Sequence, residues 1–322
     1  MPLHPIPRSI VVFQPGRLGD TILTTPLFAG LRRWAPDAHI TVLSSPDTAI
    51  IPTVHPAVDE TIALPRGLRR YPALARTLLA RQWDLAIDPK DHPSGTSRIV
   101  ARTIRTNRLV THPGNAPLRG DLLTLPEAAE PRHYVDRMLA PLQLLAPALK
   151  VERIPWYPIP AEAYRAVEQQ LPAPERPTVA VNISVGRADP HRTWPRERWH
   201  ELIERLLERV NVAVLSSPSD RALADSICPT RRNARVVETR SIVEATAVLD
   251  RVRAVVTPDT AIVHAAAVVN TPTLVLAPIG DENARSFAPL ATHSTVVMQR
   301  AGESFAEITV ERVLEAGERL LT

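Results

Sequence analysis

The fold of this chain is indicated by residues 10–20, which read IVVFQPGRLGD. The β-branched run at residues 10–13 predicts a buried strand, and the glycines of the turn that follows allow a tight change of direction. After the turn, apolar residues recur at helical spacing: Ile22, Leu23, Leu27, Leu31 and Trp34. A strand, a tight turn and an amphipathic helix in this order are typical of βαβ units around a parallel sheet.

The same alternation continues in two series. The first series predicts further strands at residues 40–43, 61–64, 85–87 and 109–110, with helices at 72–81 and 134–145. The second series predicts strands at residues 178–183, 212–215, 235–237, 254–256, 273–276 and 295–297, with a helix at 196–209. A proline-rich stretch, which holds a short helix expected at 161–171, separates them and is typical of an interdomain connection.

Two such series predict an α/β protein with two Rossmann-like, doubly wound parallel-sheet domains that face a cleft. The expected N-terminal domain spans residues 1–157 and the C-terminal domain 175–322, joined by a linker at 158–174. For the last helix two positions are open: within the C-terminal domain, or packed back on the N-terminal domain. With 44% hydrophobic and 22% charged residues in a chain of 322, there is ample apolar material for two cores.

The positive charge of the chain is almost entirely arginine, because lysine occurs only at Lys90 and Lys150. The formal net charge is +4 and the isoelectric point is about 9.7. This pattern fits either a general arginine bias or an anionic partner, since arginine binds phosphates and carboxylates in a bidentate manner. We see no cluster of interleaved basic and aromatic residues that would favour nucleic acid as a partner.

The location of the protein is indicated by what the sequence lacks. Cys228 is the single cysteine, so neither an intrachain disulfide nor a cysteine-based metal site is expected. Residues 1–8 do not have the pattern of a signal peptide, and no stretch approaches the ~20 apolar residues that span a bilayer. We expect a cytoplasmic protein whose membrane contact is peripheral, at the inner face of the plasma membrane.

The first group of candidate functional residues is Gly19, Asp20 and Thr21, where the first predicted strand gives way to a helix. Asp20 is interpreted either as a helix cap or as a general base at the carboxyl end of the strand. If Thr25 caps a helix that begins at Pro26, Asp20 is freed from capping. The glycine spacing here does not match the dinucleotide fingerprint, so a redox enzyme is disfavoured.

The second group follows the strand predicted at residues 178–183. Ser184 and Gly186 offer a hydroxyl and close backbone amides, while Arg187 and Arg192 can bind phosphate oxygens. The alternative is a solvated loop whose arginines make surface contacts. Trp194 and Trp199, which come next, are expected to pack the following helix rather than to bind a ligand.

The third group begins where the strand at residues 254–256 ends. Asp259, Thr260 and Ala261 stand at a helix start, whose free amides and dipole attract anions. His264 lies about one turn further on the same face. The alternatives are a capping role for Asp259 and a core position for His264. A metal site is not expected, because His264 has no ligand partner at suitable spacing on this helix.

Taken together, these segments resemble the ADP-heptose:lipopolysaccharide heptosyltransferases of glycosyltransferase family nine. The resemblance is carried by Arg17-Leu18-Gly19-Asp20-Thr21 with Pro26, by Arg192-Thr193-Trp194-Pro195, and by Asp259-Thr260 with His264 and Ala266; lesser matches are residues 83–88 and 133–137. It differs from the family at Ala261, where the family commonly has glycine, at residues 182–184 and at residues 89–94.

The resemblance implies a GT-B fold and inverting sugar transfer without a metal ion or other cofactor. Asp20 matches the general base, the Asp259-Thr260 turn matches the diphosphate site, and Arg192 stands near the phosphates. The implied partners are a nucleotide-sugar donor, ADP-heptose, and a saccharide, glycolipid or protein acceptor, anionic or neutral. Two rival interpretations remain: a non-catalytic nucleotide-sugar-binding protein, and a nucleotide-sugar epimerase or hydrolase.

Overall fold

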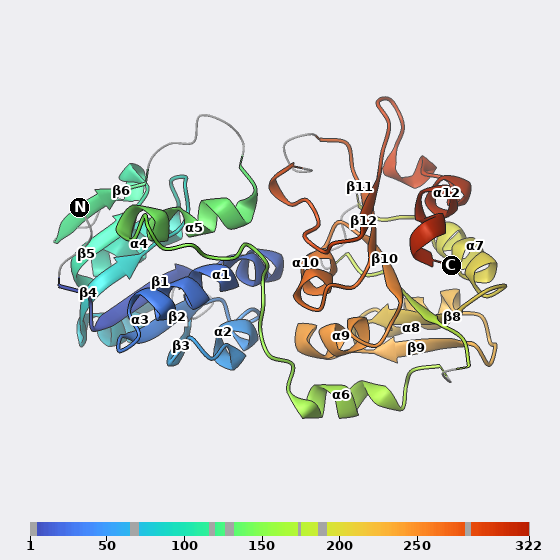
Figure 1. Cartoon of the computed structure of the whole chain (residues 1–322), viewed down its shortest axis with the longest axis horizontal. Coiled ribbons are helices and arrows are strands. Elements are labelled where there is room, and N and C mark those ends of the chain that lie inside the picture. Colours follow the sequence, from blue (N-terminus) through green and yellow to red (C-terminus); the bar gives the residue numbers. More distant parts are fainter. Residues whose placement is uncertain are drawn as a thin grey trace. The chain divides into compact units, whose positions relative to one another are not determined.

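The computed structural model describes residues 5–64, 71–115, 120–125, 132–172, 175–185, 192–280 and 285–321. The chain divides into two compact units, Met1–Pro158 and Ile159–Thr322. Each unit is built around its own six-stranded parallel sheet with helices on its faces (Figure 1).

The N-terminal sheet has the strand order β3-β2-β1-β4-β5-β6. Its strands are β1 Ser9–Gln14, β2 His39–Ser44, β3 Glu60–Ala63, β4 Gln82–Ile87, β5 Arg105–Thr111 and β6 Asp121–Thr124. The central strands are apolar runs because helices cover both faces of the sheet. All five strands expected from the sequence are present, whereas β6 was not predicted. It is a short edge strand whose side chains are mostly exposed, so it lacks an apolar run.

The helices of this unit contact one another in two groups. α1 contacts α2 and α5, and α3 contacts α4. Their bounds are α1 Leu18–Trp34, α2 Ile50–Val54, α3 Tyr71–Leu79, α4 Gly95–Thr103 and α5 Tyr134–Leu145, with a 3₁₀ turn at Pro113–Asn115. α1 and α5 approach closely at Gly30, where a Cβ atom would lie 2.3 Å from Leu142.

The start of α1 differs from the expectation that Thr25 caps a helix beginning at Pro26. The helix begins at Leu18, and Pro26 lies inside it. Proline has no N–H to offer the Ile22 carbonyl one turn earlier, but the Thr25 hydroxyl donates to that carbonyl at 2.8 Å. The same hydroxyl accepts the Trp156 N–H at 3.0 Å. Thr25 therefore compensates for the proline from within the helix.

The C-terminal sheet has the order β12-β11-β10-β7-β8-β9. Its strands are β7 Thr178–Asn182, β8 Asn211–Ser216, β9 Ala234–Glu238, β10 Ala254–Pro258, β11 Thr273–Ala277 and β12 Ser294–Met298. Its helices are α6 Ala161–Glu168, α7 Arg196–Leu206, α8 Arg221–Ile227, α9 Ile242–Leu249, α10 Ala261–Val268 and α12 Val310–Leu321, with a 3₁₀ turn at Phe305–Glu307. All six strands expected in this half are present.

Two tryptophans hold one side of this unit together. Trp194 and Trp199 are each 2% exposed, and their rings meet edge to face at 4.7 Å. The Trp194 indole N–H donates to the Ile308 carbonyl at 2.9 Å, which ties this side to the segment before α12. α12 contacts α7, β11 and β12, so its apolar face is buried within its own unit. The two tryptophans are packing residues, as predicted.

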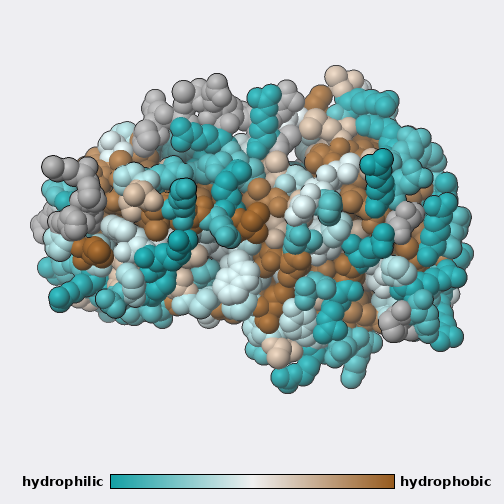
Figure 2. All heavy atoms as spheres, viewed as in Figure 1, coloured by the Kyte–Doolittle hydropathy of each residue, from teal (hydrophilic) through white to brown (hydrophobic). Residues whose placement is uncertain are grey.

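The surface seen in Figure 2 is mostly polar, with apolar residues between the polar ones. Large apolar side chains that are half exposed include Leu79, Ile154, Trp156 and Ile279. Within the part of the chain that the structure describes, no helix is both long and apolar enough to cross a membrane.

Candidate functional site

The candidate residues follow strands beside the point where each sheet reverses its winding. β1 runs on to β2 and β3 in one direction and β4 to β6 in the other, so the reversal lies between β1 and β4. In the C-terminal sheet it lies between β7 and β10 for the same reason. Doubly wound sheets bind ligands beyond the carboxyl ends of strands at such points. The described members of the three predicted groups therefore follow strands beside the points where ligands are expected.

Asp20 lies in the first turn of α1, and it does take part in capping that helix. Its Oδ2 atom accepts the Arg17 backbone N–H at 3.0 Å. The interpretation that Asp20 is freed from capping is therefore wrong, because α1 begins at Leu18 rather than at Pro26. Capping does not remove its basicity, however: a carboxylate with one N–H donor keeps further lone pairs for a ligand.

Burial raises the pKa of Asp20 above the usual range of an aspartate. The hydrogen bond from the Arg17 N–H and the positive charges of Arg17, Lys90 and Arg137 oppose that rise. Desolvation disfavours the charged form of a carboxylate, and nearby cations favour it. The result is a carboxylate that is easier to protonate than an exposed one, which suits a general base.

The Asp20 surroundings include a bidentate ion pair between α5 and the loop after β4. Nε and Nη2 of Arg137 donate to the two Asp91 carboxylate oxygens at 2.6 and 2.5 Å. The same guanidinium lies 5.3 Å from the centre of the Tyr134 ring. Arg137 is thus held firmly, with Asp91 neutralising much of its charge.

The loop at residues 89–94, which departs from the family pattern, is organised by Asp88. This side chain is fully buried and accepts from the Thr111 hydroxyl at 3.1 Å and the Asn115 amide at 3.3 Å. It also accepts the Lys90 backbone N–H at 3.3 Å. Burial, the largest effect, raises the pKa of Asp88. Sequence reasoning missed this role; the only signal was a carboxylate directly after an apolar strand.

The neighbours of Asp20 in sequence differ in exposure. Gly19 is half-buried in the first turn of α1, whereas Thr21 is fully buried and its hydroxyl donates to the Arg17 carbonyl at 3.1 Å. The Thr21 side chain therefore stabilises the helix start. A substrate-binding role for these two residues stays a prediction.

In the C-terminal unit, Asn182 connects the ends of β7 and β10. Its Nδ2 atom lies 2.9 Å from the Thr257 hydroxyl, 3.3 Å from the Thr260 hydroxyl and 3.1 Å from the Ser184 carbonyl. Its Oδ1 atom accepts the Ser184 N–H at 3.3 Å. Ser184 and Thr260, from two of the predicted groups, are therefore held by one side chain that is only 3% exposed.

The cap of α10 is Thr260, whose hydroxyl accepts the Ile262 N–H at 3.4 Å. The capping interpretation of Asp259 is therefore wrong. Instead, the Arg192 Nη1 atom donates to the Asp259 carbonyl at 3.2 Å and lies 3.8 Å from its carboxylate. Burial raises the pKa of Asp259, and Arg192 opposes the rise. The structure thus brings Arg192 from the second predicted group to the third.

Ser184 is held from the other side by Asp220, which precedes α8. The Ser184 and Ser217 hydroxyls both donate to Oδ2 of Asp220 at 2.6 Å. Sequence reasoning missed Asp220, because nothing in its local sequence connects it with Ser184. Gly186 and Arg187 lie outside the described residues.

His264 and Ala261 lie on α10, beyond its cap. His264 is 4% exposed, and its ring centre lies 6.1 Å from that of Phe287. Ala261, the first residue of the helix, is half-buried. Residues Ala265–Ala267 are buried, so small side chains let this helix lie close to the sheet. Among the residues that the structure describes, no three His, Cys, Asp or Glu side chains gather as metal ligands would.

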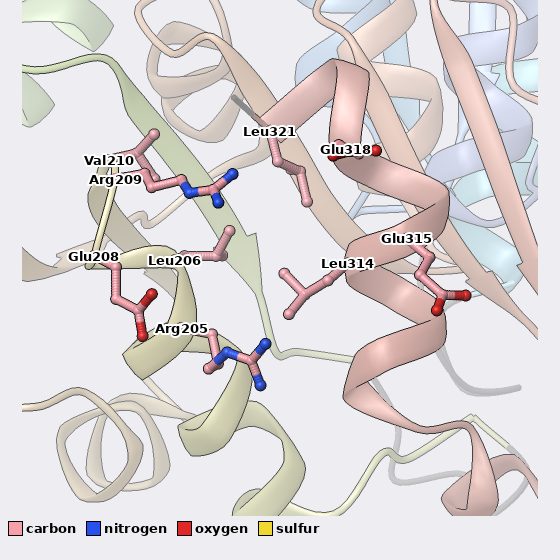
Figure 3. Close-up of a pocket in the computed structure, with 9 residues that line it drawn as sticks. All are labelled: Arg205, Leu206, Glu208, Arg209, Val210, Leu314, Glu315, Glu318 and Leu321. Atoms are coloured by element: carbon pink, nitrogen blue, oxygen red, sulfur yellow. The ribbon is translucent and has the colours of Figure 1, made fainter.

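A separate hollow of about 260 Å³ lies between α7 and α12 (Figure 3). Its floor is apolar, with Leu206, Val210 and Leu314, and charged residues such as Arg205 and Glu318 line its rim. Residues 206–210 lead directly into the start of β8. The hollow therefore lies toward the amino ends of the strands, away from the candidate site.

Comparison with known proteins gives consistent results. The sequence profile of glycosyltransferase family 9 (heptosyltransferase) matches residues 71–312. Lipopolysaccharide heptosyltransferase 1 of Pseudomonas aeruginosa is 27% identical over 299 residues, an alignment that covers 83% of this chain and 78% of that protein.

Two solved structures are similar over almost the whole chain. A family 9 glycosyl transferase of Veillonella parvula has a TM-score of 0.82 at 20% identity and covers 98% of this chain and 97% of its own. The ADP-heptose LPS heptosyltransferase II of E. coli has a TM-score of 0.77 at 24% identity, with 97% and 98% covered. These likenesses show the GT-B fold.

Proposed function

The chain belongs to glycosyltransferase family 9, the heptosyltransferase family, and on that premise we propose that it transfers a heptose from ADP-heptose, or a related sugar from its own nucleotide diphosphate, to an acceptor hydroxyl. The observation that carries the proposal is Asp20, a capped and largely buried carboxylate at the carboxyl end of β1 with a raised pKa. Such a group can accept a proton as the acceptor hydroxyl attacks.

In the proposed reaction the acceptor oxygen attacks the anomeric carbon from the face opposite the diphosphate. As the new carbon–oxygen bond forms, Asp20 takes the hydroxyl proton, and the old bond breaks with its electron pair leaving on the diphosphate. The configuration at the anomeric carbon is therefore inverted. A positioned base of this kind contributes roughly 10²–10⁴-fold to the rate.

The C-terminal unit is assigned to the donor. Arg192 can bind a phosphate oxygen in place of the Asp259 carbonyl that it now contacts. The amides at the start of α10 and the helix dipole add to this anion site. His264 lies one turn further along α10, and Asn182 connects Ser184 with the Thr260 cap. We propose that these groups stabilise the negative charge on the departing diphosphate without a metal ion, because preorganised donors stabilise developing charge.

The acceptor proposed for this chain is a saccharide of the lipopolysaccharide core or a related glycolipid. The support is the name of the Pseudomonas aeruginosa relative and the cations near Asp20. A glycolipid acceptor lies at a membrane surface, so we also propose peripheral contact with the cytoplasmic face of the inner membrane.

The test is sugar transfer by the full chain from ADP-heptose, with and without a heptose-free lipopolysaccharide acceptor. We expect ADP release that depends on the acceptor, and a product whose anomeric configuration is opposite to that of the donor. ADP release at the same rate without acceptor would instead indicate a hydrolase, and conversion of the donor sugar an epimerase. A parallel thermal-shift series with ADP, UDP and GDP tests the donor site, since a bound ligand raises the melting temperature.

A further inference from the structure

Gln14, the last residue of β1, is a buried amide whose hydrogen-bonding groups are unused. Its side chain is 0% exposed. Within the part of the chain that the structure describes, neither Oε1 nor Nε2 has a hydrogen-bond partner. A buried polar group left unsatisfied costs roughly 1–3 kcal/mol, and such groups in native proteins are few. The amide therefore has a role that its resting contacts do not reveal.

Gln14 borders the same small space as the carboxylate of Asp20. A Cβ atom at Gly16 would lie 3.0 Å from Oδ2 of Asp20 and 3.2 Å from Nε2 of Gln14. The missing side chain of Gly16 thus leaves an opening that both groups adjoin. A side chain there would push the carboxylate away from its present position.

The other groups around this space are known. The Arg17 backbone N–H holds Asp20 in its present position, and Lys90 and Arg137, the latter paired with Asp91, supply positive charge from the loop after β4 and from α5. Burial, the largest effect, raises the pKa of the neighbouring Tyr134 phenol, and the Gln14 amide opposes this rise without reaching normal hydrogen-bond geometry.

Arg17 and Gln14 suit different protonation states of Asp20. A backbone N–H is a donor only, so the Arg17 contact stabilises the ionised carboxylate. A protonated carboxyl group has one O–H donor and a remaining acceptor oxygen, and a carboxamide offers one acceptor and one donor to match them. The present contact therefore fits Asp20 before it takes a proton, and Gln14 fits it afterwards.

We propose that Gln14 is a positioning residue for Asp20, and that the newly protonated carboxyl group turns from the Arg17 N–H to the Gln14 carboxamide. This role rests on the proposed function, because it assumes that Asp20 takes the acceptor proton. The proton moves only from the acceptor oxygen to Asp20, and Gln14 itself is neither protonated nor deprotonated. Stabilising the protonated form makes Asp20 a stronger base.

The test replaces Gln14 with methionine, which has a similar length but cannot form these hydrogen bonds. We expect Gln14→Met to lower kcat about tenfold, the effect of one lost hydrogen bond of about 1.4 kcal/mol, with the KM for the donor unchanged. The acid limb of the pH–rate profile should move to lower pH. Gln14→Glu should move it to higher pH, because two neighbouring carboxylates share a proton.

A second readout is the melting temperature. Because the Gln14 amide has no partner to lose among the described residues, Gln14→Met should melt no lower than the wild type. The matched control is Thr61→Val on β3, whose buried hydroxyl also has no hydrogen-bond partner among them. This variant should gain stability in the same way and keep its transfer activity and pH profile.

Three outcomes overturn the proposal. One is a Gln14→Met variant with unchanged kcat and pH profile. Another is a loss of activity that follows a fall in melting temperature, which would indicate a purely structural role. The third is a titration of the Asp20 carboxyl carbon by NMR in which Gln14→Met does not lower the pKa. This titration needs no substrate, so a shifted pKa in a chain that transfers no sugar would refute the proposed function and leave the Gln14–Asp20 coupling standing.

Discussion

Gln14 and Asn182 occupy the same place in the two sheets, yet their surroundings are opposite. Each is a buried carboxamide at the end of the strand beside which the winding reverses. Asn182 contacts the Thr257 and Thr260 hydroxyls and both backbone groups of Ser184. Gln14 has no hydrogen-bond partner among the described residues.

The two carboxamides therefore differ in whether their hydrogen bonds are formed in the structure. Around Asn182 the hydrogen bonds are formed, so Ser184 and Thr260 are held in place, as a preformed binding site requires. Around Gln14 the hydrogen bonds are not formed, and the partner proposed above is Asp20 in its protonated form. Changes in the C-terminal unit should therefore affect binding and stability, and changes in the N-terminal unit should affect rate and pH dependence.

The largest expected effect comes from substituting Asp20, because the comparison assigns the chemical step to the N-terminal unit. Asp20→Asn keeps an oxygen that can accept the Arg17 N–H but is not basic. We expect kcat to fall roughly 10²–10⁴-fold while calorimetry gives an unchanged affinity for ADP.

Asp20→Ala is the matched variant, since it loses both the base and the capping hydrogen bond. It should be as inactive as Asp20→Asn but less stable, by about 0.5–2 kcal/mol. If Asp20→Asn retained transfer, Asp20 would act only as a helix cap. The assignment of the chemical step to the N-terminal unit would then be wrong.

A smaller effect is expected at Asn182, on binding rather than on the chemical step. Asn182→Ala leaves the hydroxyls of Thr257 and Thr260 without their central partner, which should destabilise the unit by about 1–3 kcal/mol. Melting curves would show a fall of about 2–4 °C per kcal/mol for a domain of this size. The KM for the donor should rise.

The control for Asn182 is Asn233→Ala. Asn233 donates to the Leu207 carbonyl at 3.2 Å, at the opposite end of the C-terminal sheet. Its loss should lower the melting temperature without changing the KM for the donor. Equal effects of the two variants on donor binding would contradict the special position of Asn182.

The smallest expected effect is the pH dependence of stability. Because burial raises the folded pKa of Asp20, the folded chain holds this proton more tightly than the unfolded chain, whose aspartates titrate near ~3.9. The stability contributed by the bound proton is present below that value and is lost as the pH rises through the folded pKa. Asp20→Asn should therefore melt a few degrees higher than the wild type at neutral pH, and at the same temperature as the wild type at pH ~3.

The opposite trend, a loss at neutral pH that disappears at pH ~3, would mean that the cations around Asp20 outweigh its burial. The ionised Asp20 carboxylate would then be stabilised by the surrounding charges, and the contrast between Gln14 and Asn182 would weaken.

Much of the fold was predictable because the central strands are buried on both faces and so appear as apolar runs. β6 was missed because its side chains are mostly exposed. The start of α1 was placed too late because Pro26 resembles a first helical residue, and only the contact between Thr25 and Ile22 shows why the helix tolerates it.

Of the candidate site, the residues that directly follow strands were predictable from the order of strand, turn and helix. The residues that arrange them were not. Asp88, Arg137 and Asp220 act through partners more than 20 residues away in the sequence. Gln14 was present in the quoted turn, but its significance is its lack of partners, which no sequence pattern expresses.

Gly16 has an evolutionary consequence. A single change to alanine would place a methyl group 3.0 Å from the Asp20 carboxylate and would leave every residue of the C-terminal unit as it is. If Asp20 is the base proposed above, one mutation at this position would convert a transferase into a protein that only binds its nucleotide sugar.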